Sequence, residues 1–135
     1  MKNSIISGAI AGLFSGISGF VFTIIYADFM GLSYPYSPAD IIPISNIATN
    51  EILLGVIWGA IFGIFYSILY DSIPGQGLSK GLTYGMLVFL ISRIRPVFYA
   101  MTGGDIPNAI AITFVGFFMF LIYGILLGLL YKPKK

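Results

Sequence analysis

The stretch IPNAIAITFVGFFMFLIYGILLGLLY, residues 106–131, contains no charged side chain over 26 positions. A helix that crosses the hydrocarbon core of a bilayer needs about 20 predominantly apolar residues. The stretch is therefore long and apolar enough to form a membrane-spanning helix.

Three further stretches have the same character. Residues 5–27 and 52–70 are uncharged, and residues 81–101, which follow Lys80, are apolar except for two arginines in the outer half. The first stretch is too long for the apolar core of a signal peptide and lacks a clear A-x-A site after it, so we read it as a retained helix. We expect an all-α membrane protein, a single domain over residues 1–135, with four spans at about 5–27, 51–70, 80–101 and 106–131.

Composition places the chain in lipid and argues against catalysis. Apolar residues make up 58% and charged residues 9%, whereas soluble domains carry roughly 25% charged residues. Cysteine and histidine are both absent, which removes the usual ligands of zinc and haem and the commonest general base. We therefore expect no enzyme activity, no metal and no cofactor. A net charge of +2 is too small for a nucleic-acid binder.

The predicted connections differ in length. The first is long and contains Ser37-Pro38-Ala39-Asp40, a pattern typical of a helix start, so we expect a short interfacial helix there. The second, around Pro74, is a tight turn, and the third ends at Asp105, which is placed to cap the fourth helix. With four spans both termini share one side of the membrane. Lysines predominate on that side, which predicts cytoplasmic termini.

The two halves of the chain resemble each other, which predicts a duplicated helical hairpin. Asp40 aligns with Asp105 at an offset of 65 residues. The first helices of the halves match at an offset of 73, where GAIAG at 8–12 pairs with GLTYG at 81–85. Two hairpins inserted in the same direction would be related by an axis along the membrane normal.

Glycines recur at four-residue spacing in every predicted span. At this spacing they lie nearly on one helix face, where the lack of side chains lets two backbones approach closely in lipid. The first interpretation is packing within the chain, and the alternatives are a seam against a partner protein and a glycine-lined pore. The predicted helix-packing residues are Gly8, Gly12, Gly16, Gly55, Gly59, Gly63, Gly81, Gly85, Gly124 and Gly128.

Arg93 and Arg95 are the most informative charges. If the third helix enters the membrane near Gly81, Arg93 lies about 18 Å along it, in the outer half of a core of roughly 30 Å. Three interpretations stay open: contact with lipid phosphates by snorkelling, a structural ion pair, and a functional anion or substrate site. The acids available on that side are Asp28, Asp40, Glu51 and Asp105.

A helical wheel favours Arg95 as the paired residue. It places Arg95 nearer to the glycine face than Arg93, and Glu51 is the expected partner. Pro96 follows directly and is expected to break or kink the helix, which weakens the wheel argument at this point.

Several glycine-rich segments together resemble those of uncharacterised YagU-like four-helix membrane proteins of archaea and bacteria. They are GAIAG at 8–12, GAIFGIFY at 59–66, KGLTYG at 80–85 and YGILLG at 123–128. The resemblance implies four helices and no particular biochemical activity. Such relatives often carry histidines near the second and fourth helices, where this chain has Trp58 and Tyr123. A histidine-dependent role therefore does not transfer.

The function expected from these features is that of an accessory or structural subunit packed in a larger membrane complex. No acid lies at the centre of a predicted span, which argues against a proton-coupled transporter. The alternative is a small homo-oligomeric channel or carrier for a small solute or ion. The expected partners are membrane lipids and either other membrane subunits or further copies of the chain.

Overall fold

The computed structural model describes residues 2–30, 44–103 and 106–133, and it consists of helices. Nothing is described of the side chains at a few helical positions, among them Glu51 and Arg95. The elements are α1 (Lys2–Met30), α2 (Ile44–Leu69), the short 3-10 helix η1 (Tyr70–Ser72), α3 (Leu78–Met101) and α4 (Ile106–Leu130).

Three of the four helices are long and apolar enough to cross a membrane. The apolar segments are Asn3–Phe22 in α1, Ile52–Ser72 in α2 and η1, and Ala109–Leu130 in α4. Over its described residues, helix α3 is not among them. Its sequence includes two serines, a lysine and two arginines, which lower its hydropathy relative to the other three.

The helices extend beyond the apolar stretches from which they were predicted. Helix α2 already begins at Ile44, and α1 continues to Met30, because backbone hydrogen bonding does not stop where the apolar sequence stops. Pro96 does not end α3, which continues to Met101. One proline removes a single N–H donor, and helices of membrane proteins tolerate this.

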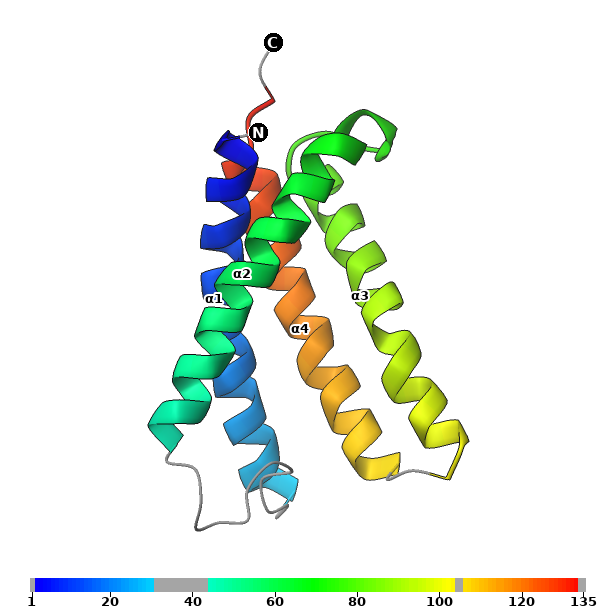
Figure 1. The fold of residues 1–135 in the computed structure, drawn as a ribbon. Coiled ribbons are helices and arrows are strands. Elements are labelled where there is room, and N and C mark those ends of the chain that lie inside the picture. Colours follow the sequence, from blue (N-terminus) through cyan, green and yellow to red (C-terminus); the bar gives the residue numbers. More distant parts are fainter. Residues whose placement is uncertain (1, 31–43, 104–105, 134–135) are drawn as a thin grey trace.

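The helices form two antiparallel hairpins that meet through α1 and α4. Helix α1 packs along α2, α3 packs along α4, and α1 packs along α4. Figure 1 shows the start of α1 and the end of α4 at the same end of the bundle, and α3 diverging from α2 toward the other end. Helices α2 and α3 are therefore the outer members of the arrangement.

The predicted tight turn between the hairpins is confirmed. Gly75 and Gly77 adopt positive φ angles of 101° and 48°, a conformation that glycine reaches without steric cost. The backbone N–H of Gly81 donates to the carbonyl of Gly77 at 3.1 Å. The predicted interfacial helix around Pro38 and the predicted cap at Asp105 lie outside the described residues.

Candidate functional site

In the α1–α2 hairpin, glycine meets glycine along the whole crossing. A Cβ atom added to Gly59 would lie 2.6 Å from the Cα atom of Gly12, and one added to Gly63 would lie 2.8 Å from that of Gly8. One added to Gly55 would come within 3.1 Å of the Cα atom of Gly16. These contacts leave no room for a side chain, so the backbones of the two helices touch directly.

The α3–α4 hairpin repeats two of these contacts at equivalent positions. A Cβ atom on Gly81 would lie 2.5 Å from the Cα atom of Gly128, and one on Gly85 would lie 3.0 Å from that of Gly124. Shifting Gly8 and Gly63 by the sequence offsets of 73 and 65 gives the first of these pairs. The same offsets that relate the sequences therefore relate these spatial contacts.

The third contact of the first hairpin has no glycine counterpart in the second. Gly16 and Gly55 correspond to Phe89 and Phe120 under the same offsets. The two rings face each other across α3 and α4 with their centroids 6.4 Å apart. Two aromatic side chains thus occupy the place where the first hairpin brings two backbones together.

Arg93 lies one turn beyond this aromatic pair. Its Cζ atom is 5.8 Å from the ring centroids of both Phe89 and Phe120. Its Nη1 atom donates to the carbonyl oxygen of Ile112 at 2.7 Å. A Cβ atom on Gly116 would come within 2.8 Å of that Nη1 atom, so the absence of a side chain at 116 makes room for the guanidinium.

The guanidinium makes hydrogen bonds through two of its three nitrogens. Its Nε atom donates to the hydroxyl of Ser92 at 3.3 Å, and Nη1 is engaged by Ile112. Within the described part of the chain no buried side-chain nitrogen or oxygen lacks a partner, and Nη2 makes no hydrogen bond there. The Nη2 atom lies against the backbone of Gly116, 2.5 Å from the place that a Cβ atom would take there.

No described carboxylate balances this charge. Asp71, in η1, is the one acidic residue whose side chain the structure describes. It precedes α3, whereas Arg93 lies 15 residues after Leu78, the first residue of α3, which is about 22 Å along the axis. Arg93 is therefore a half-buried cation held by a carbonyl and two rings.

The contact of Arg93 with α4 departs from the helical-wheel expectation. The wheel placed Arg93 farther from the glycine face than Arg95, yet Arg93 packs on Gly116 of α4. The wheel assumed a straight seam, whereas a ridge of every fourth residue, from Gly81 through Phe89, drifts round the helix and reaches position 93. The predicted pair of Arg95 with Glu51 stays a prediction, because both side chains lie outside those described. Asp40 and Asp105 also lie outside the described residues.

Three hydroxyl groups, which the sequence reading did not single out for such contacts, connect the helices. Tyr84 donates to the carbonyl of Phe62 at 2.7 Å, and Tyr123 donates to the carbonyl of Gly59 at 2.9 Å. Ser15 donates to the carbonyl of Met119 at 2.9 Å. A hydroxyl inside an apolar helix is the sequence signal for such bonds, because it must find an acceptor away from water.

A polar pocket of about 330 Å³ lies at the end of the bundle where α1 starts. Beside the pocket, the Lys80 ammonium donates to the backbone carbonyl of Tyr70 at 2.5 Å. It also lies 4.0 Å from the centroid of the Tyr70 ring. The rings of Tyr70 and Tyr131 are 5.2 Å apart. The lining residues are Asn3, Ser4, Ser67, Tyr70, Asp71, Tyr131, Lys132 and Pro133.

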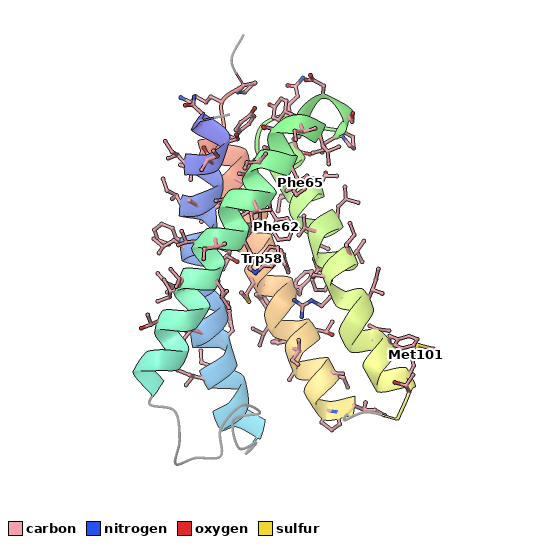
Figure 2. All side chains as sticks on the ribbon, viewed as in Figure 1. Trp58, Phe62, Phe65 and Met101 are labelled. Carbon is pink, nitrogen blue, oxygen red and sulfur yellow. The ribbon has the colours of Figure 1, made fainter. Side chains whose placement is uncertain are left out.

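Trp58 lies on α2 between the two ends. Its side chain is 52% exposed and stacks on Phe62 with ring centroids 5.9 Å apart. Figure 2 shows Trp58, Phe62 and Phe65 along the same stretch of α2. The ring contact supports a packing role for this indole.

No protein-family model, curated protein or solved structure matches the chain. The resemblance to YagU-like proteins therefore remains a prediction from the sequence. Among the described residues no group of three histidine, cysteine, aspartate or glutamate side chains could hold a metal ion.

Proposed function

We propose that the chain is a four-span integral membrane protein of a cell membrane and a non-catalytic accessory subunit of a larger membrane complex. The observation that carries the proposal is the combination of low hydropathy and sparse packing in α3. This helix is the least suited to lipid by hydropathy. Among the described residues it packs along α4, and it touches α2 through Tyr84 near its start. A polar helix that packs along one neighbour over most of its length is poorly solvated by lipid, and a helix from another subunit would complete its surroundings.

The surface of α3 supports this assignment. Beside Arg93, apolar side chains recur at spacings of three and four residues and stand clear of the rest of the chain. Figure 2 shows Met101 at the end of α3 that lies away from α2. The row, which we call the α3 face, comprises Leu90 (59% exposed), Ile94 (67%), Val97 (48%) and Met101 (81%).

The glycine seams support a rigid subunit rather than a pore. The glycines on both hairpins contact backbone of the same chain, so these seams are already occupied and do not line a passage. The hydroxyls of Tyr84 and Tyr123 are engaged by backbone carbonyls. The remaining contact surface for a partner is the outside of the bundle.

Photocrosslinking tests the proposal. A photoreactive residue replaces Ile94 on the α3 face, and a matched variant carries it at Ile6, which is 49% exposed on α1. We expect position 94 to give an adduct of one defined mass with a foreign subunit that also co-purifies stoichiometrically in mild detergent. Position 6 should give lipid adducts. Lipid adducts at both positions, or adducts with the chain itself, would overturn the accessory role.

We further propose that both termini face the cytoplasm. Five lysines, Lys2, Lys80, Lys132, Lys134 and Lys135, belong to the side of the termini, against Arg93 and Arg95 on the other, and basic residues favour the cytoplasmic side. Because the chain has no cysteine, a single Gln76→Cys can be labelled without background. We expect no labelling of intact cells by an impermeant reagent, and labelling from outside would contradict the topology.

The alternative is a small homo-oligomeric channel or carrier. One observation favours it: the polar pocket combines the acidic side chain of Asp71 with the basic side chain of Lys132 at one end of the bundle, as a solute entrance would. Self-adducts at position 94, a pure homo-oligomer by mass spectrometry, and solute flux in vesicles that Asp71→Asn abolishes would together support this second function.

A further inference from the structure

Arg93 carries a charge at a depth where lipid offers little to pair with it. From the outer end of α3 at Met101, the residue lies 8 positions inside the helix, which is about 12 Å. Its contact on α4, Ile112, lies 6 positions after Ile106, or about 9 Å. Lipid phosphates lie at the level of the helix ends, so a phosphate would have to be drawn into the apolar core to reach the guanidinium.

The contacts around Arg93 fix the side chain but do not neutralise it. The carbonyl of Ile112, the hydroxyl of Ser92 and the rings of Phe89 and Phe120 are all uncharged. Ionisable groups at membrane depth are costly and are normally paired with an opposite charge. The arrangement therefore holds a half-buried cation in place with no opposite charge among the described residues.

The α3 face lies beside this cation. Leu90 and Val97 are three residues before and four residues after Arg93, so they share its side of the helix. A second membrane helix laid along these exposed apolar side chains would pass Arg93 at the same depth. Charge complementarity then decides what that helix carries.

We propose that the α3 face binds a transmembrane helix of a partner subunit that carries an aspartate or glutamate about 12 Å inside the outer membrane surface, and that this carboxylate pairs with Arg93. The inference rests on the proposed accessory function and names the chemistry of its partner. An arginine fork can bind a carboxylate through two parallel hydrogen bonds, and the guanidinium has only neutral partners among the described residues. The neutral groups around the guanidinium keep the fork oriented before the partner arrives.

The test uses synthetic helices in place of the unidentified subunit. Peptides of about 20 leucine and alanine residues, flanked by lysines, carry one Asp, Asn or Leu at the matching depth. The full chain is labelled through Gln76→Cys, at the opposite end from Arg93, and each peptide carries an acceptor dye. Energy transfer in phosphatidylcholine vesicles then measures association as a function of peptide density.

The expected result is a preference of at least about tenfold for the Asp peptide over the Leu peptide, with the Asn peptide close to the latter. Arg93→Gln should abolish this preference, and Arg93→Glu should transfer it to a peptide that carries Lys at the same position. Lys132→Gln makes the same charge change at the other end of the bundle and should leave the preference intact. Circular dichroism and a monodisperse detergent profile exclude misfolding, and Arg93→Lys, which keeps the charge, should retain part of the preference.

Equal association of the Asp and Leu peptides with the wild-type chain would overturn the proposal. Should that happen while native mass spectrometry finds phosphatidylglycerol retained by the wild type and lost from Arg93→Gln, the ligand is a lipid phosphate and not a partner carboxylate. An adduct with a foreign subunit at position 94 that survives Arg93→Gln unchanged would also overturn the carboxylate while leaving the accessory function standing. The failure of the inference is thus distinguishable from the failure of the proposed function.

Discussion

In the α1–α2 hairpin, glycine faces glycine from Gly8 to Gly16, whereas the equivalent of Gly16 in the α3–α4 hairpin is Phe89. A Cβ atom added to Gly55 would lie only 3.1 Å from the Cα atom of Gly16, so the two backbones are nearly in contact there. Phe89 and Phe120 instead meet through rings 6.4 Å apart. At this one pair of equivalent positions, the first hairpin has a contact between backbones and the second has a contact between aromatic rings.

This difference explains where a charge is tolerated. Two backbones in contact exclude every side chain, so the first hairpin has no space for a guanidinium along its seam. In the second hairpin the rings of Phe89 and Phe120 lie between the helices, and Arg93 lies against both rings and against Gly116. Aromatic faces attract cations. The first hairpin is thus built for packing, and the second combines packing with a cation.

The largest effect is expected from filling the shared part of the two seams. Gly59→Leu would push backbone against backbone, since even a Cβ atom there lies 2.6 Å from the Cα atom of Gly12. We expect a loss beyond the ~1–3 kcal/mol of ordinary overpacking, or failure to assemble. Gly124→Leu should be damaging but less so. A Cβ atom at Gly124 would lie 3.2 Å from the Cα atom of Gly85, which leaves more space than at Gly59.

Thermal unfolding in detergent measures these two variants against Ala60→Leu, which adds a larger side chain to the neighbouring position of α2, where the side chain is only half-buried. Gly31→Leu, a glycine that the sequence places in the first loop, is the second control. Equal expression and equal thermal stability of all four variants would remove the claim that the seams hold the hairpins together.

The apolar helices and their glycine faces could be predicted from the sequence, but the place of Arg93 could not. Hydropathy predicts four apolar segments, and glycine spacing predicts which faces are free of side chains, because both depend only on local sequence. The sequence does not contain the crossing direction of α3 over α4, and that direction decides that Arg93 meets Gly116. The hydroxyl bonds of Tyr84 and Tyr123 to α2 depend on the packing of helices far apart in the chain.

The second effect distinguishes the two arginines. Arg93→Gln removes a charge-assisted hydrogen bond to Ile112, which is typically worth about 1.5–3 kcal/mol. If the predicted Arg95–Glu51 pair exists, Arg95→Gln should lower the free energy of unfolding by about 3–5 kcal/mol, because it leaves a buried carboxylate unpaired. A double-mutant cycle with Arg95→Gln and Glu51→Gln, scored by thermal unfolding, separates the cases. Additive losses would remove that pair, and a larger loss at Arg93 would identify it as the arginine that the fold holds.

A smaller effect is expected where the second hairpin bonds to the first. Tyr84→Phe and Tyr123→Phe each remove one hydroxyl donor to a carbonyl of α2. Hydrogen bonds between membrane helices average about 0.6 kcal/mol and reach ~1.7, so each variant should lower the unfolding temperature only slightly. Tyr70→Phe serves as the control, because Tyr70 is involved through its ring and its backbone carbonyl. A loss at Tyr70 equal to that at Tyr123 would mean that the hydroxyl bonds do not join the hairpins.

The smallest effect on stability separates the two uses of glycine within one helix. Gly116→Ala and Gly124→Ala add the same methyl group to α4. At Gly124 that methyl would lie 2.6 Å from the carbonyl oxygen of Gly81, which is backbone, whereas at Gly116 it would lie 2.5 Å from Nη2 of Arg93, the far end of a flexible side chain.

The guanidinium can move aside, so we expect Gly116→Ala to cost well under the ~1–3 kcal/mol of overpacking that Gly124→Ala should reach. Gly116→Ala should instead affect the binding of a partner helix, because a displaced Arg93 guanidinium loses its hydrogen bond to Ile112 and its orientation. Gly116→Ala should therefore weaken the preference for an Asp-bearing helix while the unfolding temperature stays near that of the wild type. A variant with lowered stability and an intact preference would mean that Gly116 serves packing, as Gly124 does, and not the placement of Arg93.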